Sequence, residues 1–321
     1  MSFHVLSLWP LTPSARRRLE AVAERVDDEG GRELSRDELA ARLGDVDGLI
    51  CFPLTAKLDG PMIASAPRLR VIATVAVGYD NIDLGVCAER GIAVGNTPGV
   101  IADATADIGM ALILATMRRI VSGVDFVRAG RWERGEMHPY GNDLAHKTLG
   151  IFGMGAIGMA LARRARAAGM TIVYHNRRPR SDAGDARYLD FDAFLRAADV
   201  VAVTSPLTPE TRGIFGAEAF AAMKPGTYFV NIARGGIVQT DALYEALRSG
   251  RLAYAGLDVT DPEPLPLAHP LFGLPNVVVS PHMGTSTPET RDAMLDLAVS
   301  NCIAGLRGEP LPAAVPLPTA R

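Results

Sequence analysis

Three short segments of the chain each follow an apolar run that predicts a β-strand, and together they supply an arginine, a glutamate and a histidine. The three residues are Arg234, Glu263 and His282. In an open parallel sheet, ligands bind outside the carboxyl ends of the strands, so we expect these side chains to meet at one site. Such a set can orient, polarise and protonate a carbonyl.

These groups suit hydride transfer to a 2-oxo acid, whose carbonyl oxygen gains negative charge and must be protonated. His282 can donate the proton, since an imidazole titrates near neutral pH. Glu263, if hydrogen-bonded to His282, would stabilise the imidazolium and orient its ring. Arg234 can hold the substrate carboxylate and carbonyl oxygen. Each residue alone is also typical of a structural role, and only their common position after successive strands favours a site.

A glycine-rich turn upstream predicts binding of a dinucleotide. It follows an apolar strand expected at 148–152 and opens a helical pattern. In this context the first glycine permits a tight turn, the second lets the backbone approach a pyrophosphate, and the third allows helix and strand to pack closely. The N–H groups at the helix start would bind the phosphates. The residues expected to contact the cofactor here are Gly153, Gly155, Ala156, Ile157 and Gly158.

The residues that follow the next predicted strand favour NADP(H) over NAD(H). NAD-binding versions of this unit usually place Asp or Glu about 20 residues after the turn, where it binds the ribose hydroxyls. Here that place holds Asn176, Arg177 and Arg178. An amide does not repel a 2′-phosphate, and two guanidinium groups can pair with it. The alternative is an ordinary solvated basic turn, and NAD(H) stays possible.

Composition excludes several classes of protein. The chain has 321 residues, 48% of them hydrophobic, which is enough for two ordinary globular domains. A formal net charge of -3 provides no general attraction to nucleic acid or to anionic membranes. Three dispersed cysteines indicate neither a disulfide framework nor a metal site. No basic leader and no membrane-length apolar stretch is recognisable, so we expect a cytoplasmic protein.

Short β-rich runs alternate with helical patterns from end to end, which is typical of an α/β protein with a mainly parallel sheet. The first series of strands is expected at 4–8, 48–51, 71–75 and 92–94, with helices at 14–25, 37–43 and 83–90. A long helix at 102–118 and a polar arm near 131–146 lead to a second series of strands at 148–152, 171–175, 200–204, 228–232, 253–259 and 277–280.

We therefore expect two doubly wound parallel-sheet domains. A Rossmann dinucleotide-binding domain would span 98–285. A smaller, flavodoxin-like substrate domain would be discontinuous, formed by 1–97 together with 286–321, because the last helical pattern lies beyond the final strand and can return to the first unit.

Several segments, in order along the chain, resemble the D-isomer-specific 2-hydroxyacid dehydrogenase family. The resemblance extends from about Leu49 to Leu306. The matching landmarks lie at 77–83, 96–99, 148–158, 231–236, 257–259 and 281–282. The resemblance implies the family's catalytic roles for Arg234, Glu263 and His282. It implies that Val77 and Gly78 bind the substrate carboxylate through their N–H groups and that Leu54 faces the substrate. The further cofactor contacts it implies are Thr105, Ser205, Ile232, Asp258 and Gly284.

The basic turn at 176–178 is similar to that of the glyoxylate/hydroxypyruvate reductase branch, which includes bacterial 2-ketogluconate reductases. The resemblance implies NADPH-dependent reduction of a small 2-oxo acid to the D-2-hydroxy acid. It also implies a homodimer formed through 102–146, with His138 and Tyr140 on an arm that can reach the neighbouring subunit's active site.

Two other functions stay open: an NAD-dependent dehydrogenase of another 2-oxo acid, and a non-catalytic regulator that senses dinucleotides on the same fold. The complete catalytic set favours an enzyme. The residues do not specify which 2-oxo acid is the substrate.

Overall fold

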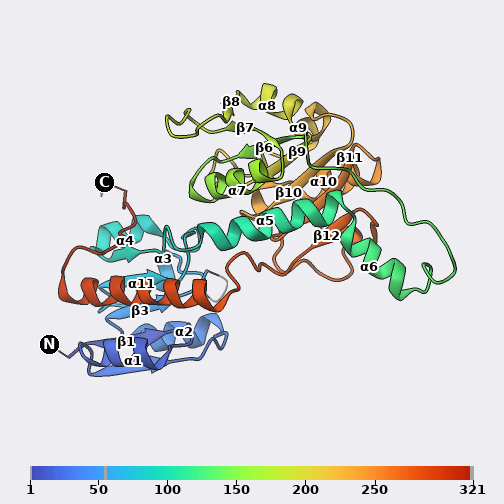
Figure 1. The fold of residues 1–321 in the computed structure, drawn as a ribbon. Helices are drawn as coiled ribbons and strands as arrows, with labels where there is room; N and C mark the ends of the chain where they lie inside the picture. The colour runs from blue at the N-terminus through green and yellow to red at the C-terminus, as the bar shows by residue number, and fades with distance from the viewer. Residues whose placement is uncertain (1, 54–55, 319–321) are drawn as a thin grey trace. The chain divides into compact units, whose positions relative to one another are not determined.

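The chain forms two units, each built on its own parallel sheet (Figure 1). The computed structural model describes residues 2–53 and 56–318. Unit 1 comprises Met1–Ile101 and Thr287–Arg321, and unit 2 comprises Ala102–Ser286. The sequence prediction places the breaks after residues 97 and 285. The predicted fold class, α/β with two doubly wound parallel sheets, is confirmed.

Unit 1 contains five parallel strands in the order β2-β1-β3-β4-β5, which is the flavodoxin-like arrangement. The strands are β1 His4–Ser7, β2 Arg25–Asp28, β3 Gly48–Cys51, β4 Val71–Thr74 and β5 Ala93–Gly95. β3 and β4 are buried along their whole length, as expected for parallel strands covered on both faces.

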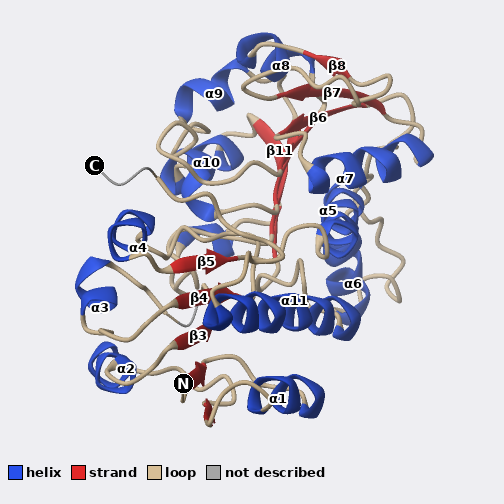
Figure 2. Cartoon of the chain, turned by 90° about the vertical axis from the view of Figure 1, so that its left-hand side faces the viewer, coloured by secondary structure: helices blue, strands red, loops and turns tan. Residues whose placement is uncertain are grey.

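Helices cover both faces of this sheet (Figure 2). They are α1 Pro13–Glu20, α2 Arg36–Leu43, α3 Gly60–Ala64, α4 Leu84–Arg90 and α11 Pro288–Arg307. α11 begins after Thr287, whose side chain accepts the N–H of Thr290. It packs so closely on β4 that a Cβ on Gly305 would lie 2.5 Å from the Cβ of Val71. The C-terminal helix is therefore an integral part of unit 1.

Unit 2 contains seven parallel strands in the order β12-β11-β10-β9-β6-β7-β8. They are β6 Thr148–Phe152, β7 Thr171–His175, β8 Arg187–Tyr188, β9 Val200–Val203, β10 Thr227–Asn231, β11 Leu252–Leu257 and β12 Val277–Val279. This is the Rossmann order extended by one strand, and its direction reverses between β6 and β9. The loops after those two strands therefore flank the expected nucleotide crevice.

The helices of unit 2 pack against two separate apolar cores, one on each face of the sheet (Figure 2). The helices are α5 Ala102–Met117, α6 Ile120–Arg128, α7 Ala156–Ala167, α8 Phe191–Ala197, α9 Ala217–Ala222 and α10 Thr240–Arg248, with short 3₁₀ turns at Gly235–Ile237 and Pro270–Gly273. None of the described helices is long and apolar enough to cross a membrane.

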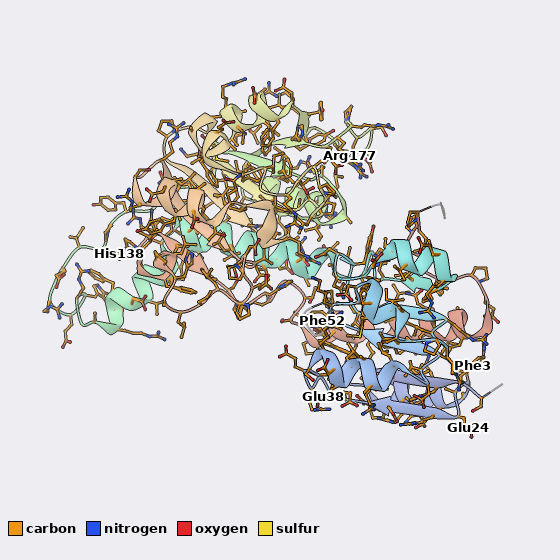
Figure 3. All side chains as sticks on the ribbon, turned by 180° about the vertical axis from the view of Figure 1, so that it is seen from behind. Phe3, Glu24, Glu38, Phe52, His138 and Arg177 are labelled. Atoms are coloured by element: carbon orange, nitrogen blue, oxygen red, sulfur yellow. The ribbon has the colours of Figure 1, made fainter. Side chains whose placement is uncertain are left out.

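The predicted helix at 102–118 ends one residue early, and a second helix, α6, follows it. Arg119 separates α5 from α6 with a left-handed φ of 54°. After α6 the chain runs as a loop that carries His138 (Figure 3), whose ring packs edge-on against Phe126. This arm has little regular structure, as its sequence predicts.

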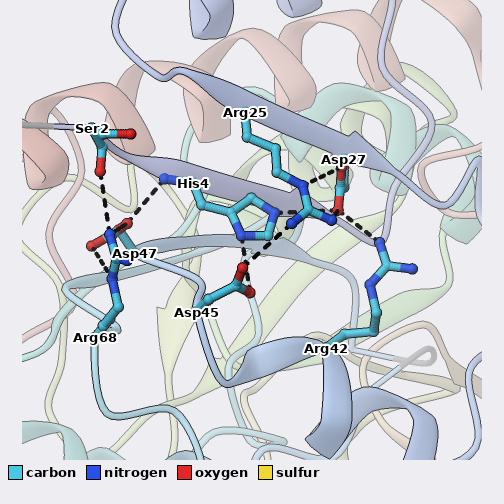
Figure 4. Close-up of polar contacts among 8 residues, drawn as sticks. All are labelled: Ser2, His4, Arg25, Asp27, Arg42, Asp45, Asp47 and Arg68. Carbon is cyan, nitrogen blue, oxygen red and sulfur yellow. Dashed lines mark hydrogen bonds and ion pairs between the residues drawn. The ribbon is translucent and has the colours of Figure 1, made fainter.

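The predicted helix at 14–25 is wrong at its end, because α1 stops at Glu20 and Arg25 begins the edge strand β2. Charged side chains conceal this strand in the sequence. Asp27 contacts Arg25 at 2.7 Å, Arg42 at 2.9 Å and Nε2 of His4 at 3.2 Å, while Nδ1 of His4 lies 3.1 Å from Asp45 (Figure 4). Polar contacts within β2, to helix α2 and to His4 on β1 replace the apolar pattern that would have indicated a strand.

Cys51, Cys87 and Cys302 are free and buried in unit 1. Burial raises the thiol pKa to about 12 for Cys51, about 11 for Cys87 and about 12 for Cys302. Thiols with such high pKa values are structural rather than reactive.

Candidate active site

The glycine turn after β6 has the backbone geometry that a dinucleotide pyrophosphate requires. Gly153 has a φ of 104°, and a Cβ there would lie 2.5 Å from the N atom of Ser205. A Cβ on Gly158 would lie 2.6 Å from the carbonyl of Gly153, whereas the space beside Gly155 is open. Two of the glycines thus allow close packing, and the third leaves room for a ligand.

Helix α7 begins directly after this turn with no side chain capping it. The N–H groups of its first turn, which includes Ala156 and Ile157, are the donors that bind phosphate in such folds. Thr204, which follows β9, donates its hydroxyl to the carbonyl of Gly153 at 2.6 Å, so the loops on the two sides of the switch point are tied together. Ser205 is the next residue and lies against the turn. These residues fit a dinucleotide.

The basic turn after β7, at 176–178, contains one side chain that is bonded to the backbone of the glycine turn and two exposed cationic side chains. The Oδ1 atom of Asn176 accepts the N–H of Met154 at 2.7 Å, which leaves its Nδ2 as a donor. Arg177 and Arg178 are exposed, and neither makes an ion pair within the described residues (Figure 3 for Arg177). By contrast, Arg180 is paired with Asp182 at 2.5 Å. Two guanidinium groups without an ion pair among the described residues therefore lie beside the nucleotide turn, although the charge of Arg177 helps to lower the pKa of Glu210.

The loop that carries Arg234 is held by the last residue of β10. Nδ2 of Asn231 donates to the carbonyl of Arg234 at 2.9 Å, and Oδ1 accepts the N–H of Ala233 at 3.0 Å. At Gly235 any Cβ would lie 1.9 Å from the carbonyl of Thr260. Only glycine allows this approach, so the loops after β10 and β11 lie directly against each other.

The histidine and the glutamate form the closest polar contact of the site. Nδ1 of His282 lies 2.5 Å from Oε1 of Glu263, and Oε2 accepts the N–H of Thr260 at 3.3 Å. Burial acts to raise the pKa of Glu263, but the hydrogen bond and charge of His282, together with Thr260 and Arg234, lower it below its ordinary value. In the described part of the chain, Nε2 of His282 makes no hydrogen bond, so it is available to a ligand.

Asp258 anchors the histidine loop, a role that the sequence did not reveal. Its carboxylate is 2% exposed and accepts the N–H groups of Met283 and Gly284, both at 2.8 Å, and the hydroxyl of Ser280 at 2.6 Å. Its carbonyl accepts the N–H of His282 at 3.0 Å. These bonds hold His282 at a φ of 51°, in the left-handed region. A buried acid directly after a buried strand was the available signal.

Three of the other predicted cofactor residues lie around the same loop. Thr105, on the first turn of α5, donates its hydroxyl to the carbonyl of Gly284 at 3.1 Å. The side chain of Ile232 is buried in the core beneath α5, so any contact it makes with a cofactor would involve its backbone. The cofactor contacts of Thr105, Ile232, Asp258 and Gly284 stay predictions.

The predicted substrate residues outside these loops belong to unit 1. Val77 and Gly78 follow β4, and the carbonyl of Val77 accepts Nδ2 of Asn96 at 2.8 Å. Leu54 lies outside the described residues. On the arm of unit 2, Nε2 of His138 lies 3.1 Å from the hydroxyl oxygen of Ser122 on the same chain, and Tyr140 is 83% exposed.

Comparison with known proteins yields one family and a consistent set of relatives. The sequence model described as "D-isomer specific 2-hydroxyacid dehydrogenase, NAD binding domain" matches residues 110–284. A glyoxylate reductase of Pyrococcus furiosus is 45% identical over 292 residues, which cover 88% of this chain and 86% of the relative. A glyoxylate/hydroxypyruvate reductase B of Escherichia fergusonii is 44% identical over 278 residues, covering 85% of each chain.

The solved structures that resemble this one include an NADPH-dependent glyoxylate/hydroxypyruvate reductase of Sinorhizobium meliloti in complex with NADP and malonate. It is 33% identical, with a TM-score of 0.88, and the match covers 98% of this chain and 97% of that one. The predicted resemblance to this branch of the family is confirmed.

Proposed function

Because the chain belongs to the D-isomer specific 2-hydroxyacid dehydrogenase family, we propose that it uses NADPH to reduce a small 2-oxo acid to the D-2-hydroxy acid. The substrate would be of the glyoxylate, hydroxypyruvate or 2-ketogluconate type. The observation that carries the proposal is the contact of 2.5 Å between Glu263 and Nδ1 of His282, which leaves Nε2 for a substrate. The names of the relatives support the substrate class.

The reaction requires three functions of the protein: binding of the substrate, transfer of a proton and orientation of the histidine. Arg234 holds the substrate carboxylate and polarises the carbonyl. His282 donates the proton on Nε2 to the carbonyl oxygen as negative charge develops there, and in the reverse direction it accepts that proton. Glu263 keeps the imidazolium charged and oriented through Nδ1. The nicotinamide supplies the hydride when the cofactor is bound on the turn at Gly153–Gly158.

Backbone donors would bind the substrate carboxylate. We propose that these are the N–H groups of Val77 and Gly78, as the family resemblance implies. Val77→Ala retains that N–H group and should therefore leave the Michaelis constant for the 2-oxo acid within about threefold of the wild-type value. Val77→Pro, which lacks the N–H group, should raise it by about tenfold or more.

The experiment that tests the function is a panel of 2-oxo acids assayed by NADPH oxidation at 340 nm. At least one of glyoxylate, hydroxypyruvate and 2-ketogluconate should give saturable turnover, and pyruvate should be a poorer substrate. Tight NADPH binding without turnover of any acid would instead identify a dinucleotide sensor.

Preference for NADPH rests on the two unpaired arginines and on the amide of Asn176. Removing both arginines in Arg177→Ala with Arg178→Ala should raise the Michaelis constant for NADPH by about tenfold or more, since charge-assisted hydrogen bonds to phosphate are lost. The constant for NADH should change little. Arg180→Ala is the matched control, because it removes an arginine of the same segment that is already paired with Asp182. Equal effects on both cofactors would refute the preference.

A homodimer is supported by an exposed apolar surface on α6 and the arm. Its members are Ile120, Val121, Val124, Val127, Trp132, Met137 and Tyr140, each between 43% and 83% exposed. Large apolar side chains that are exposed close together in the chain favour a protein interface. Val124→Glu with Val127→Glu should convert a dimer into a monomer in light scattering, and a monomeric wild type would refute the interface.

A further inference from the structure

Unit 2 contains a cavity of about 130 Å³ at the edge of the sheet opposite the catalytic loops. Its lining includes Lys147, Asp199 and Gly226, which directly precede β6, β9 and β10. Those three strands are neighbours in the sheet, so the cavity lies at their amino-terminal ends. An engineered apolar cavity of about 150 Å³ binds benzene, so this one has room for a ligand of roughly five or six heavy atoms.

The charges that line the cavity sum to one net positive charge, from two lysines and one aspartate. The aspartate is already satisfied. Oδ1 of Asp199 lies 2.8 Å from Nζ of Lys224, and Oδ2 accepts the N–H of Thr148 at 2.8 Å. Burial acts to raise the pKa of Asp199, but these two partners and the charge of Lys147 lower it. The ammonium of Lys147 is therefore the charge left to attract a ligand.

One neutral group of the cavity is a donor without an acceptor. Tyr228 is 7% exposed, and its hydroxyl oxygen accepts Nδ2 of Asn142 at 2.8 Å. The hydroxyl hydrogen has no acceptor among the described residues, and a buried donor without an acceptor costs free energy. An acceptor in the cavity would satisfy it. Two ammonium groups disfavour a metal cation, and the volume is too small for a nucleotide.

We propose that this cavity is a second, non-catalytic site that binds a small oxyanion, either a carboxylate or inorganic phosphate, through Lys147 and the hydroxyl of Tyr228. Strand β10 links it to the catalytic edge, because Thr227 and Tyr228 lie at the cavity and Asn231, at the other end of the strand, holds the Arg234 loop. The span is about 13 Å at 3.3 Å per residue.

The test is isothermal titration calorimetry, in which inorganic phosphate or glycolate is titrated into the full-length protein at low ionic strength. An Arg234→Gln background saturated with cofactor occupies the nucleotide site and weakens binding of both probes at the catalytic site, so the binding that is lost in the cavity variants below is assigned to the cavity. One ion should bind per chain, about tenfold or more weaker in Lys147→Gln and several-fold weaker in Tyr228→Phe. Lys57→Gln, which removes an exposed lysine of unit 1, is the matched control and should leave binding unchanged.

Binding of phosphate alone identifies a phosphate site, binding of glycolate alone identifies a carboxylate site, and binding of both identifies the shared oxyanion chemistry. Should Lys147→Gln fail to fold, Tyr228→Phe decides, since it removes only a hydroxyl. The proposal is overturned if neither probe binds saturably, or if the folded variants bind as tightly as the parent.

Discussion

In unit 2, the carboxyl ends and the amino ends of the strands, here called the carboxyl edge and the amino edge of the sheet, each have an aspartate whose carboxylate oxygens are both hydrogen-bonded. The two aspartates bind different partners. At the carboxyl edge, Asp258 binds backbone N–H groups of the loop that carries His282. At the amino edge, Asp199 binds the N–H of Thr148 and the ammonium of Lys224. The first positions a side chain with a free nitrogen, whereas the second neutralises a cation.

This difference indicates which ends of the strands in unit 2 can position a side chain for proton transfer. The end of each strand fixes the start of the loop that follows it, and in such sheets ligands bind outside the carboxyl ends of the strands. The loops after β11 and β12 hold Glu263 against His282 there and leave Nε2 available. At the amino-terminal ends of the strands the cavity is lined by two lysines and by an aspartate whose two oxygens are already bonded, so we infer that it is suited to binding an anion and not to proton transfer.

The largest expected effect comes from removing the reactive nitrogen at the carboxyl edge. His282→Ala should lower turnover by about two to four orders of magnitude, the range typical of a lost general acid–base group. His269→Ala is the matched control, because His269 lies between β11 and β12, in the segment before the His282 loop, and caps the 3₁₀ turn at Pro270–Gly273. Steady-state kinetics of both variants provide the comparison. Near-normal turnover of His282→Ala would remove this residue from the mechanism.

A second pair of variants compares the two aspartates directly. Asp258→Asn should destabilise the fold by about 1–3 kcal/mol, since an amide cannot accept all three of the donors that the buried carboxylate serves. It should also lower turnover strongly because the His282 loop loses its anchor. Asp199→Asn should lower stability too, with a loss of turnover at least about tenfold smaller. Thermal unfolding and kcat measure both. Equal losses of turnover would show that Asp258 has no special positioning role.

The smallest effect is the acid dependence of stability. The pKa values of Glu263 and Asp199 are both lowered in the folded state, so each carboxylate contributes stability above its ordinary pKa that is lost as the pH falls through the folded value. The free energy of unfolding should decrease below about pH 4.5, the ordinary value for a glutamate. Urea denaturation across this range should show a shallower decrease in Glu263→Gln and in Asp199→Asn. An unchanged slope in both would contradict these shifts.

Much of the fold, and the contact between Glu263 and His282, could be predicted because both follow from local patterns. Buried parallel strands are continuous apolar runs, and the glycine turn after β6 has a fixed spacing. Strand β2 was not predicted, because its side chains are mostly charged. The predicted end of α5 was one residue too late, because nothing in its apolar sequence indicates the left-handed backbone of Arg119. The cavity could not be predicted, since its lining joins residues from 117 to 228 that meet only in the folded sheet.

The central claim is that unit 2 directs a hydride to the carbonyl carbon of a 2-oxo acid while His282 protonates its oxygen. The most direct measurement is incubation with hydroxypyruvate and NADPH that carries deuterium at the transferred position of C4, followed by mass and NMR analysis of the product. We expect the wild-type protein to form D-glycerate with one deuterium on C2, and His282→Ala to form it far more slowly. Bound NADPH with no deuterated product, from hydroxypyruvate or from glyoxylate, would contradict it.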